Sequence, residues 1–260
     1  MATDPTQPPA GPAQPPAGRL QRFDATERFV HWSTAILFAV LALTGSALYL
    51  QPVGAIFGRR HLVEEVHVYS GIALAVPVLI GLAGPWGRQL RADFGRFNRW
   101  SVSDKAWLAA RLRGRRATDR PATGLPVGKF NAGQKLNAAW TAGAGIVMLA
   151  TGLIMRFYSP WPLSWRTGAT FVHDWLAFAM VVVVAGHVGM ALRHPEAFAS
   201  MRTGWVSRDW AKRNAPAWLD GADGKEGSPD KLRVAPDKLR VARGAAGEAE
   251  YATGPAQPTS

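Results

Sequence analysis

The residues of this chain best suited to chemistry are its six histidines, and two of them lie within one apolar segment. The stretch FVHDWLAFAMVVVVAGHVGMALRH, residues 171–194, holds His173 and His187 fourteen residues apart, and it ends at a third histidine, His194. On a helix that rises about 1.5 Å per residue, they would be separated by about 21 Å and would lie within about 40° of the same face. Because a neutral imidazole can bind a metal through a ring nitrogen, one helix would offer two ligands at different depths.

Four uncharged, apolar runs are available to position these histidines. They are residues 29–58, 66–87, 136–155 and 175–192. Each run is near the roughly 17–25 residues with which a helix crosses about 30 Å of hydrocarbon. The runs predict an all-α integral membrane protein with a four-transmembrane-helix bundle, its helices over about 27–50, 65–84, 133–156 and 169–193. No small-residue cleavage pattern marks the first run as a signal peptide, so it is expected to remain as a helix.

The distribution of charge predicts how these helices are oriented. A net charge of +12 would suggest a nucleic-acid partner in a soluble protein, but most basic residues of the loops lie in one place. They are concentrated between the second and third predicted helices, residues 88–135, whereas the other two loops contain only Arg59, Arg60, Arg156 and Arg166. By the positive-inside rule, the central loop and both termini are expected to be cytoplasmic, and no nucleic-acid partner is expected.

This topology pairs four histidines across the predicted helices. The first helix starts and the fourth ends on the inner side, which places His31 level with His187. The second helix starts outside, which places His67 level with His173. A single intramembrane histidine could equally be a hydrogen-bonded structural residue, although an ionisable group in a span is by default a functional hypothesis. Two cross-helix imidazole pairs predict two bis-histidine haem b groups, one inner and one outer.

Small residues accompany all four histidines. Four positions after each of them, on the same helix face, come Ala35, Gly71, Ala177 and Ala191. Gly45 and Gly81 each follow a histidine by fourteen positions, so the first two helices would each present a ligand at one haem level and a glycine at the other. Such residues would give a porphyrin room to approach. The alternative is that Gly and Ala are simply frequent in membrane helices.

The remaining candidate residues have weaker patterns. His61 and His194 are expected at the surface, although His194 or Arg193 could pair with a propionate of the inner haem, and Arg156 with one of the outer haem. Cysteine is absent, which excludes thiolate-bound iron–sulfur clusters on this chain. Any redox cofactor must therefore use other ligands.

The segment GKFNAGQK, residues 128–135, precedes the third predicted helix. One interpretation is a polar helix start at the membrane interface, with Asn131 as its N-cap. The other is that Asn131 and Gln134 face a cavity beside the inner haem and offer their amide groups to a quinone carbonyl. The amides alone do not decide between the two.

Several segments together resemble the gamma (cytochrome b) subunit of respiratory formate dehydrogenases, within the di-haem cytochrome b membrane-anchor superfamily. They are FVHW in the first helix, HVYSG in the second, FNAGQK before the third, the histidine pair of the fourth, and GWVSRDWAKRNAPAW after it. The match covers roughly residues 22–218. Histidine spacing alone would also fit the cytochrome b anchor of a nickel–iron hydrogenase or another molybdopterin oxidoreductase, but FNAGQK and VSRDWAKR are more specific.

The resemblance implies a four-helix anchor with one haem b near each membrane face. The matching positions are His31 and His187 for the inner haem, His67 and His173 for the outer haem, and Asn131, Gly133 and Gln134 for a quinone pocket beside His187. These histidines would be the axial ligands of the haem irons. The quinone, menaquinone or ubiquinone, would be the electron acceptor.

The resemblance also implies partners and a place in the cell. An iron–sulfur beta subunit would pass electrons from a molybdenum or tungsten alpha subunit, which contains molybdopterin and oxidises formate. This chain would be the quinone-reducing subunit of that oxidoreductase complex, surrounded by lipid in the bacterial plasma membrane, and would not oxidise formate alone. A non-redox transporter or scaffold with structural histidines is the competing class, and it would contain no haem.

The chain is thus expected to have four parts. They are a disordered Pro/Ala-rich N-terminus over 1–21, the four-helix domain over 22–203, a short interfacial helix rich in Trp and basic residues over 204–218, and a disordered tail over 219–260. The tail contains PDKLRVA twice. Within the second predicted helix, Pro77 is expected to cause a kink.

Overall fold

The structure is a computed structural model that describes residues 18–113 and 127–223. The chain divides into two units, Met1–Trp218 and Leu219–Ser260, and helix α11 (Pro216–Asp223) crosses the boundary between them. The first unit contains all the elements discussed below. Most of the segments predicted to be disordered, including both copies of PDKLRVA, lie outside the described residues.

Four helices of the described chain are long and apolar enough to cross a membrane, as predicted. The first is α1 (Ala25–Tyr49), and the second consists of α3 (Arg60–Ala73) followed by α4 (Val76–Ala83). The third and fourth are α7 (Ala132–Arg156) and α8 (Leu163–Arg193). The predicted boundaries are close for α1 and α7, whereas α3 and α8 begin several residues earlier than predicted.

Local chemistry explains where two of these helices begin and break. Helix α1 starts with a capping box, in which the Asp24 carboxylate accepts the Glu27 N–H at 2.8 Å and the Glu27 carboxylate accepts the Asp24 N–H at 2.8 Å. The second span is interrupted at Leu74 and Ala75, directly before Pro77 in the first turn of α4. Proline has no N–H to continue the helical hydrogen bonds, which accounts for the interruption where the sequence predicts a kink.

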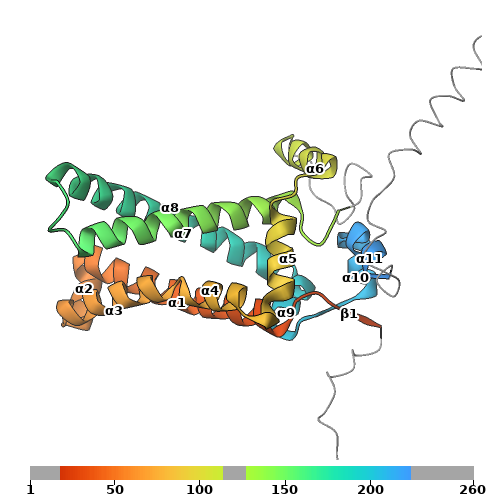
Figure 1. The fold of residues 1–260 in the computed structure, drawn as a ribbon, viewed down its shortest axis with the longest axis horizontal. Helices are drawn as coiled ribbons and strands as arrows, with labels where there is room; N and C mark the ends of the chain where they lie inside the picture. The colour runs from red at the N-terminus through yellow and green to blue at the C-terminus, as the bar shows by residue number, and fades with distance from the viewer. Residues whose placement is uncertain (1–17, 114–126, 224–260) are drawn as a thin grey trace, which may run out of the picture. The chain divides into compact units, whose positions relative to one another are not determined.

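The long helices form two packed pairs (Figure 1). Helix α1 packs against α3 and α4, α7 packs against α8, and α3 contacts α7 across the bundle. We call the end where α1 begins and α8 ends the terminal end, and the end where α7 turns into α8 the hairpin end. Helix α2 (Gln51–Phe57) lies between α1 and α3 at the hairpin end.

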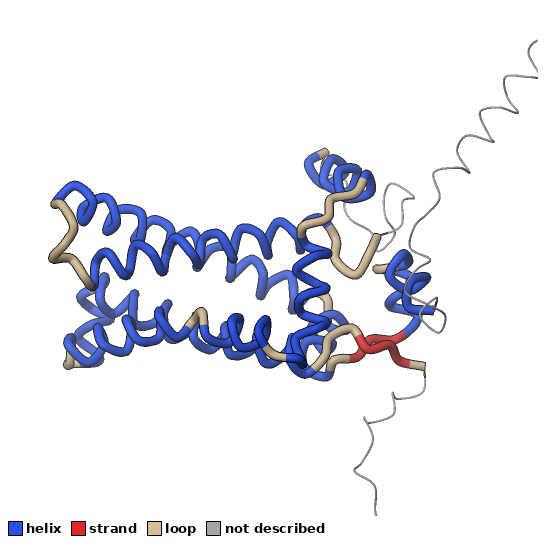
Figure 2. Tube along the Cα trace, in the orientation of Figure 1, coloured by secondary structure: helices blue, strands red, loops and turns tan. Residues whose placement is uncertain are grey.

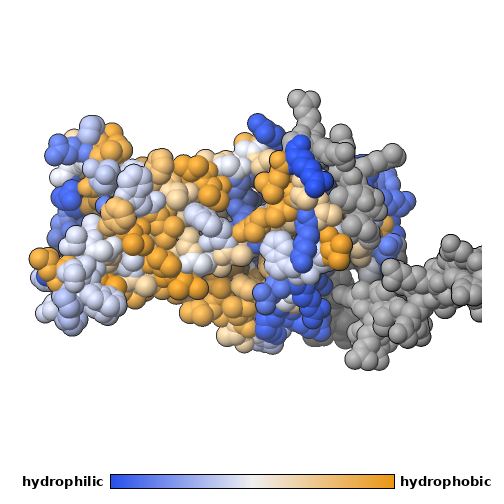
Figure 3. Space-filling view, turned by 90° about the horizontal axis from the view of Figure 1, so that it is seen from above, coloured by the Kyte–Doolittle hydropathy of each residue, from blue (hydrophilic) through white to orange (hydrophobic). Residues whose placement is uncertain are grey.

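The outer surface of this bundle is apolar along its middle. Large side chains such as Ile36, Leu79, Ile146 and Phe178 are each more than 60% exposed. Figure 3 shows hydrophobic side chains gathered over the middle of the long helices, with hydrophilic side chains toward the ends. Such a contiguous apolar surface is unfavourable in water and matches the hydrocarbon of a bilayer.

The loop between the second and third spans contains helices that the sequence analysis did not predict. The short helix η1 (Pro85–Gly87) leads into α5 (Arg88–Phe97), and α6 (Val102–Leu112) follows before the chain enters α7. Helix α5 contacts α1, α4 and α7, and α6 contacts α7. These two helices therefore cover part of the terminal end.

The chain segments before the first span and after the fourth span are joined by a small sheet (Figure 2). Strand β1 (Arg19–Gln21) pairs antiparallel with β2 (Trp205–Ser207), with Leu20 opposite Val206. The sequence analysis predicted disorder through residue 21 and one helix over 204–218, and both predictions are wrong in part. After α9 (Pro195–Thr203), Gly204 turns the chain with a φ of +91°, β2 follows, and the helix is limited to α10 (Arg208–Asn214) and α11.

Candidate functional site

The structure brings the four intramembrane histidines together in the two predicted pairs. The ring centroids of His31 and His187 are 6.3 Å apart at the terminal end. Those of His67 and His173 are also 6.3 Å apart at the hairpin end. The rings are strongly inclined to each other, at 60° and 67°. Each pair contains one ring from the α1, α3 and α4 side of the bundle and one from α8.

The separation within each pair fits a metal ion held between two imidazoles. A metal–imidazole nitrogen bond is about 2 Å long, and each ring centroid lies roughly 1 Å beyond its nitrogen, so the centroids should be roughly 6 Å apart. Within the described residues, no group of three or more His, Cys, Asp or Glu side chains could hold a metal. Two imidazoles do not by themselves complete the coordination of an iron ion, so an iron held at either pair would need further ligands. A porphyrin would supply four nitrogens, and the two histidines of one pair could then complete the coordination of its iron.

Helix α8 fixes the spacing between the two pairs. It runs without interruption from Leu163 to Arg193 and contributes one histidine to each pair. Fourteen residues of helix separate His173 from His187 by about 21 Å along the axis. The distance between the sites is therefore set mainly by one rigid element.

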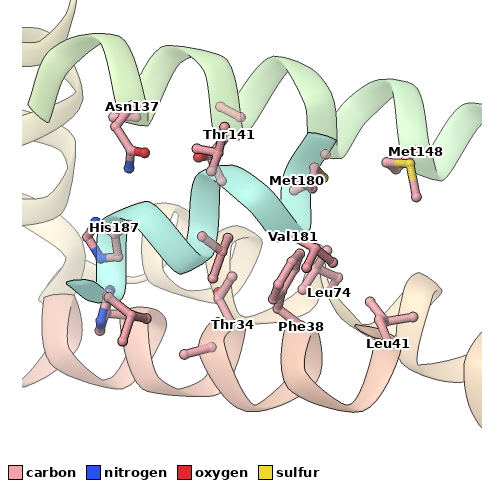
Figure 4. Close-up of a pocket in the computed structure, with 18 of the residues that line it drawn as sticks. Thr34, Phe38, Leu41, Leu74, Asn137, Thr141, Met148, Met180, Val181 and His187 are labelled. Atoms are coloured by element: carbon pink, nitrogen blue, oxygen red, sulfur yellow. The ribbon is translucent and has the colours of Figure 1, made fainter. Parts of the chain in front are cut away.

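A cavity of about 2840 Å³ runs between the helix pairs and is lined by all four histidines. The small residues expected beside them also line it, namely Ala35, Gly71, Ala177 and Ala191. Between the two histidine levels the wall is mostly apolar: Phe38 and Leu41 of α1 and Met180 and Val181 of α8 line it, and Thr34 and Thr141 add hydroxyl groups (Figure 4). A large, mostly apolar cavity with few polar groups is the usual environment of a bound cofactor.

The two glycines expected at opposite haem levels occupy different surroundings. A Cβ placed on Gly45 would lie 3.3 Å from Cε1 of His67, so this glycine is in contact with the hairpin-end pair as expected. A Cβ on Gly81 would instead meet Val30 Cγ2 at 2.7 Å and Leu90 Cδ2 at 2.8 Å. Gly81 thus allows close packing of α4 against α1 and α5.

The structure confirms the N-cap interpretation of Asn131, and the quinone interpretation stays a prediction. Asn131 is the N-cap of α7, and its side-chain oxygen accepts the Gln134 N–H at 3.0 Å. The side-chain oxygen of Gln134 accepts the Asn131 N–H at 3.0 Å in return. Because the two oxygens are held by backbone donors, the NH₂ groups are oriented away from the cap. Both residues line the cavity, where an amide NH₂ can donate to a ligand carbonyl.

Gly133 is explained by a helix that the sequence analysis did not predict. A Cβ at this position would approach the ring of Trp107, on α6, to 2.9 Å. Gly133 and Trp107 both line the cavity beside the two amides. Trp107 is therefore a further residue of this pocket, and Gly133 lets α6 pack closely against α7.

Helix α7 also contributes polar residues that the sequence analysis missed. Asn137 and Thr141 follow Gln134 at helical spacing, and all three line the cavity. In Figure 4, Asn137 points from α7 into the cavity on the side where His187 lies. The signal in the sequence was a polar residue at every third or fourth position of an otherwise apolar helix.

A buried lysine joins three segments at the terminal end. Lys129 Nζ lies 3.0 Å from a Glu27 carboxylate oxygen and 2.5 Å from one of Asp93. All three side chains are at most 5% exposed, and Arg96 also pairs with Asp93. The cluster connects α1, α5 and the segment before α7, and it forms part of the cavity wall. Charges of this kind are tolerated in the interior only when they are paired.

Arg22 connects this cluster to the C-terminal part of the unit. Its guanidinium lies 4.5 Å from the ring centroid of Trp210 in α10, which is a cation–π contact. Burial lowers the pKa of Arg22 to about 10, and the Asp93 and Glu27 carboxylates oppose that shift. Arg22 therefore remains a cation at neutral pH. Trp210 is the tryptophan of the VSRDWAKR segment, and its contact with Arg22 gives that residue a role in packing.

A second ion pair attaches α6 to α7. Lys135 Nζ lies 2.7 Å from the Asp104 carboxylate, and it also donates to the Arg99 carbonyl at 2.8 Å. Burial by itself would raise the pKa of Asp104, but hydrogen bonds from Lys135 and Ser101 lower it below its ordinary value. The pair holds the helix that carries Trp107 beside the pocket.

The other charged candidates differ in position. His61 is 88% exposed beside Glu65, at the surface as expected. His194 is also exposed, but it lines the cavity at the terminal end. Arg156 lines the cavity at the hairpin end, where Arg60 joins it, and Arg156 is 3.8 Å from Glu65. Arg193 is not among the lining residues of the described chain.

Comparison with known proteins shows a family that the chain matches over most of its length. The model described as prokaryotic cytochrome b561 matches residues 22–204. In Escherichia coli strain K12, the cytochrome b556(Fdn) subunit of nitrate-inducible formate dehydrogenase is 27% identical over 219 residues, covering 79% of this chain and 94% of that protein. The cytochrome b556(fdo) subunit of formate dehydrogenase from the same strain is 26% identical over 204 residues, covering 76% and 90%.

A third relative is the formate dehydrogenase cytochrome b556 subunit of Haemophilus influenzae. It is 23% identical over 207 residues, covering 77% of this chain and 82% of that protein. The resemblance predicted from the sequence motifs is confirmed by these matches.

Proposed function

We propose a function from the premise that this chain belongs to the prokaryotic cytochrome b561 family, whose model matches most of its length. Membership of a cytochrome b family implies haem b. The proposed function is that of the membrane cytochrome b subunit of a formate dehydrogenase complex, which passes electrons from a partner subunit to the quinone pool. The names of the relatives favour formate dehydrogenase over hydrogenase as the complex.

The observation that carries this proposal is the pair of equal imidazole separations. Two histidine pairs, each 6.3 Å between centroids, lie at two depths of one cavity. We propose that His31 and His187 hold one haem b and that His67 and His173 hold the other. Bound there, the two haems would supply one-electron carriers at two levels of the membrane. The propionate carboxylates of the haems would find basic side chains at both ends of the cavity. These are Arg156 and Arg60 at the hairpin end and His194 at the terminal end.

The pocket at the terminal end is proposed to bind the quinone. Asn131 and Gln134 present NH₂ donors held by the capping box, and Asn137 adds a polar group one turn further along α7. These amides can orient a quinone carbonyl, while Trp107 and the apolar wall exclude water from the ring. Reduction of a quinone to a quinol consumes two electrons and two protons, so the carbonyl oxygens must be oriented where protons can reach them.

Charge supports an orientation in which the terminal end is cytoplasmic. The basic residues of α5, α6 and the segment before α7 are at this end, in agreement with the positive-inside rule. In this orientation His31 and His187 form the inner site, and His67 and His173 form the outer site. Quinone reduction at the terminal end would take protons from the cytoplasm and so contribute to the proton-motive force.

The relatives are named as subunits of formate dehydrogenases, which supports a complex of this chain with other subunits. An iron–sulfur beta subunit would deliver electrons, and a molybdopterin alpha subunit would oxidise formate, with the whole complex in the bacterial plasma membrane. This chain contains no cysteine to hold an iron–sulfur cluster of its own. It is thus proposed to be the quinone-reducing subunit and to depend on its partners for formate oxidation.

The test is a measurement of haem and of two activities in the purified complex. A reduced-minus-oxidised spectrum should show haem b at about two per chain. His187→Ala should remove one haem and block quinone reduction by formate, while formate oxidation with a soluble dye as acceptor continues. A colourless protein would overturn the proposal, and so would equal loss of both activities in His187→Ala.

A further inference from the structure

The two hairpin-end histidines have matching hydrogen bonds that the proposed function does not require by itself. Thr44 Oγ1 lies 2.8 Å from Nδ1 of His67, and Thr151 Oγ1 lies 2.9 Å from Nδ1 of His173. Both threonines are buried, at 8% exposure each. Each therefore reaches from its own helix to a ring on the neighbouring helix.

The contacts of the two threonine hydroxyl groups indicate which ring nitrogen carries the imidazole proton. Each threonine also donates to a carbonyl of its own helix, Thr44 to Val40 at 2.7 Å and Thr151 to Val147 at 2.8 Å. A hydroxyl has one hydrogen, and a carbonyl can only accept, so the oxygen lone pair is left to accept from the ring. With the hydroxyl as acceptor, the proton resides on Nδ1, and Nε2 has the free lone pair that a metal requires.

A glycine follows each threonine and makes room for the same ring. A Cβ on Gly45 would lie 3.3 Å from Cε1 of His67, and a Cβ on Gly152 would lie 3.4 Å from Cε1 of His173. A Cβ at Gly45 would be tight against the ring edge next to the hydrogen-bonded nitrogen, and a Cβ at Gly152 would be in van der Waals contact with that edge. We call Thr44–Gly45 and Thr151–Gly152 the two Thr–Gly cradles.

The cradles occupy the same place in two helices of the same length. Helices α1 and α7 both have 25 residues, and each threonine lies nineteen residues after the first residue of its helix. Within the part of the chain that the structure describes, no side chain makes an equivalent hydrogen bond to the ring of His31 or His187. The cradles therefore distinguish the hairpin-end pair from the terminal-end pair.

We propose that the two Thr–Gly cradles are positioning devices that hold Nε2 of His67 and Nε2 of His173 toward one shared iron. This proposal rests on the proposed function, because it takes the hairpin-end pair to be a haem site. A hydrogen bond from Nδ1–H makes the imidazole a stronger donor, and a stronger donor favours the oxidised metal. The cradles would thus both orient the ligands of the hairpin-end haem and lower its midpoint potential.

The experiment uses Thr44→Val and Thr151→Val, singly and together, in the full complex. Valine keeps the shape of threonine but cannot accept a hydrogen bond. Thr170→Val is the matched control, because Thr170 is exposed on α8 and donates in the same way to its own helix, to the Arg166 carbonyl at 3.1 Å. Haem content, the midpoint potential of each haem and low-temperature EPR signals would be measured. His67→Ala would identify which signal belongs to the hairpin-end haem.

We expect each cradle variant to change one of the two haem signals and to leave the other as in the wild type. The hairpin-end haem should have a more positive midpoint, and the double variant should bind it about 10–100-fold more weakly. Thr44→Ser and Thr151→Ser should restore the wild-type signal, since serine keeps the acceptor. If a valine variant does not accumulate, Gly45→Ala provides the same test, because its methyl group would crowd the His67 ring.

The outcomes separate this proposal from the proposed function. If the wild-type complex lacks two bis-histidine haems, the proposed function fails. If the wild type has both haems and the valine variants match Thr170→Val in haem content, midpoints and EPR, only the cradle proposal is overturned. Equal changes in both haem signals would also overturn it, because they would indicate a general structural effect.

Discussion

Lys129 and Glu27 are 102 residues apart in the sequence, yet their side chains form a buried ion pair at 3.0 Å. Lys129 also pairs with Asp93, so its removal would take the ammonium group from the buried Glu27 carboxyl and leave Asp93 paired with Arg96. We expect Lys129→Met to destabilise the protein by about 3–5 kcal/mol, the usual effect of removing one partner of a buried pair. The measurement is thermal unfolding of the purified protein in detergent.

The control for this variant is Lys105→Met, at an exposed lysine of α6. It should change the stability by less than about 0.5 kcal/mol, as surface substitutions usually do. Equal melting temperatures for the two variants would show that the Lys129 cluster does not stabilise the terminal end.

The Asp104–Lys135 pair should make the attachment of α6 dependent on pH. Hydrogen bonds lower the pKa of Asp104 in the folded protein below its ordinary value of 3.8. The stabilisation is therefore fully present above that ordinary value and is lost as the pH falls below it. Asp104→Asn should be less stable than the wild type at pH 7, and the difference should shrink below about pH 4. Thermal melts between pH 7 and pH 3, followed by tryptophan fluorescence, would measure the stability difference between the variant and the wild type. A difference that stays constant over this range would contradict a stabilising Asp104–Lys135 ion pair.

Helix α8 should keep both histidine pairs aligned only while its length between them is preserved. One alanine inserted after Val181 would rotate His187 relative to His173 by about 100° and move it by about 1.5 Å. We expect the protein to retain one haem and lose the other. An alanine inserted at Ser159, in the turn before α8, is the control and should leave two haems, as counted by absorbance per chain. Two haems in both insertion variants would contradict a fixed spacing by α8.

The capping box of α7 allows the structural and binding roles of its amides to be separated. Asn131→Asp and Gln134→Glu keep an oxygen acceptor for each cap hydrogen bond but remove the NH₂ donors. We expect stability and haem spectra close to those of the wild type, with quinone reduction about tenfold slower through the loss of one hydrogen bond. Asn131→Ala should in addition cost about 0.5–2 kcal/mol of stability. Unchanged quinone kinetics in the first two variants would exclude the amides from the quinone pocket.

The spanning helices and the histidine pairs could be predicted from the sequence because their signals are local or regular. An uncharged run shows a span directly, and topology then places His31 beside His187 and His67 beside His173. Asn131 as an N-cap was also visible, since a capping residue acts within a few positions. The predicted start of α8 was six residues late, and the break before Pro77 was predicted only as a kink, because both depend on local backbone chemistry.

The missed features depend on contacts between segments far apart in the sequence. Helix α6 is short and partly charged, and its packing through Trp107 onto Gly133 has no local pattern. The Thr–Gly cradles were missed because a threonine in an apolar helix is ordinary until a ring is known to lie beside it. Lys129 looked like one of many basic residues at an interface, and only the fold shows that it is buried.

The pairing of β1 with β2 has a consequence for the order in which the chain folds. Strand β1 is the first described element to leave the ribosome, and β2 is synthesised only after all four spans. The sheet therefore cannot form until α8 has entered the bilayer, and a pairing so distant in sequence is intrinsically slow. Until then β1 has no strand partner and α1 is not joined to the far end of the chain. Pairing of β1 with β2 would be a late event in biogenesis, because it would occur only after all four spans have been made.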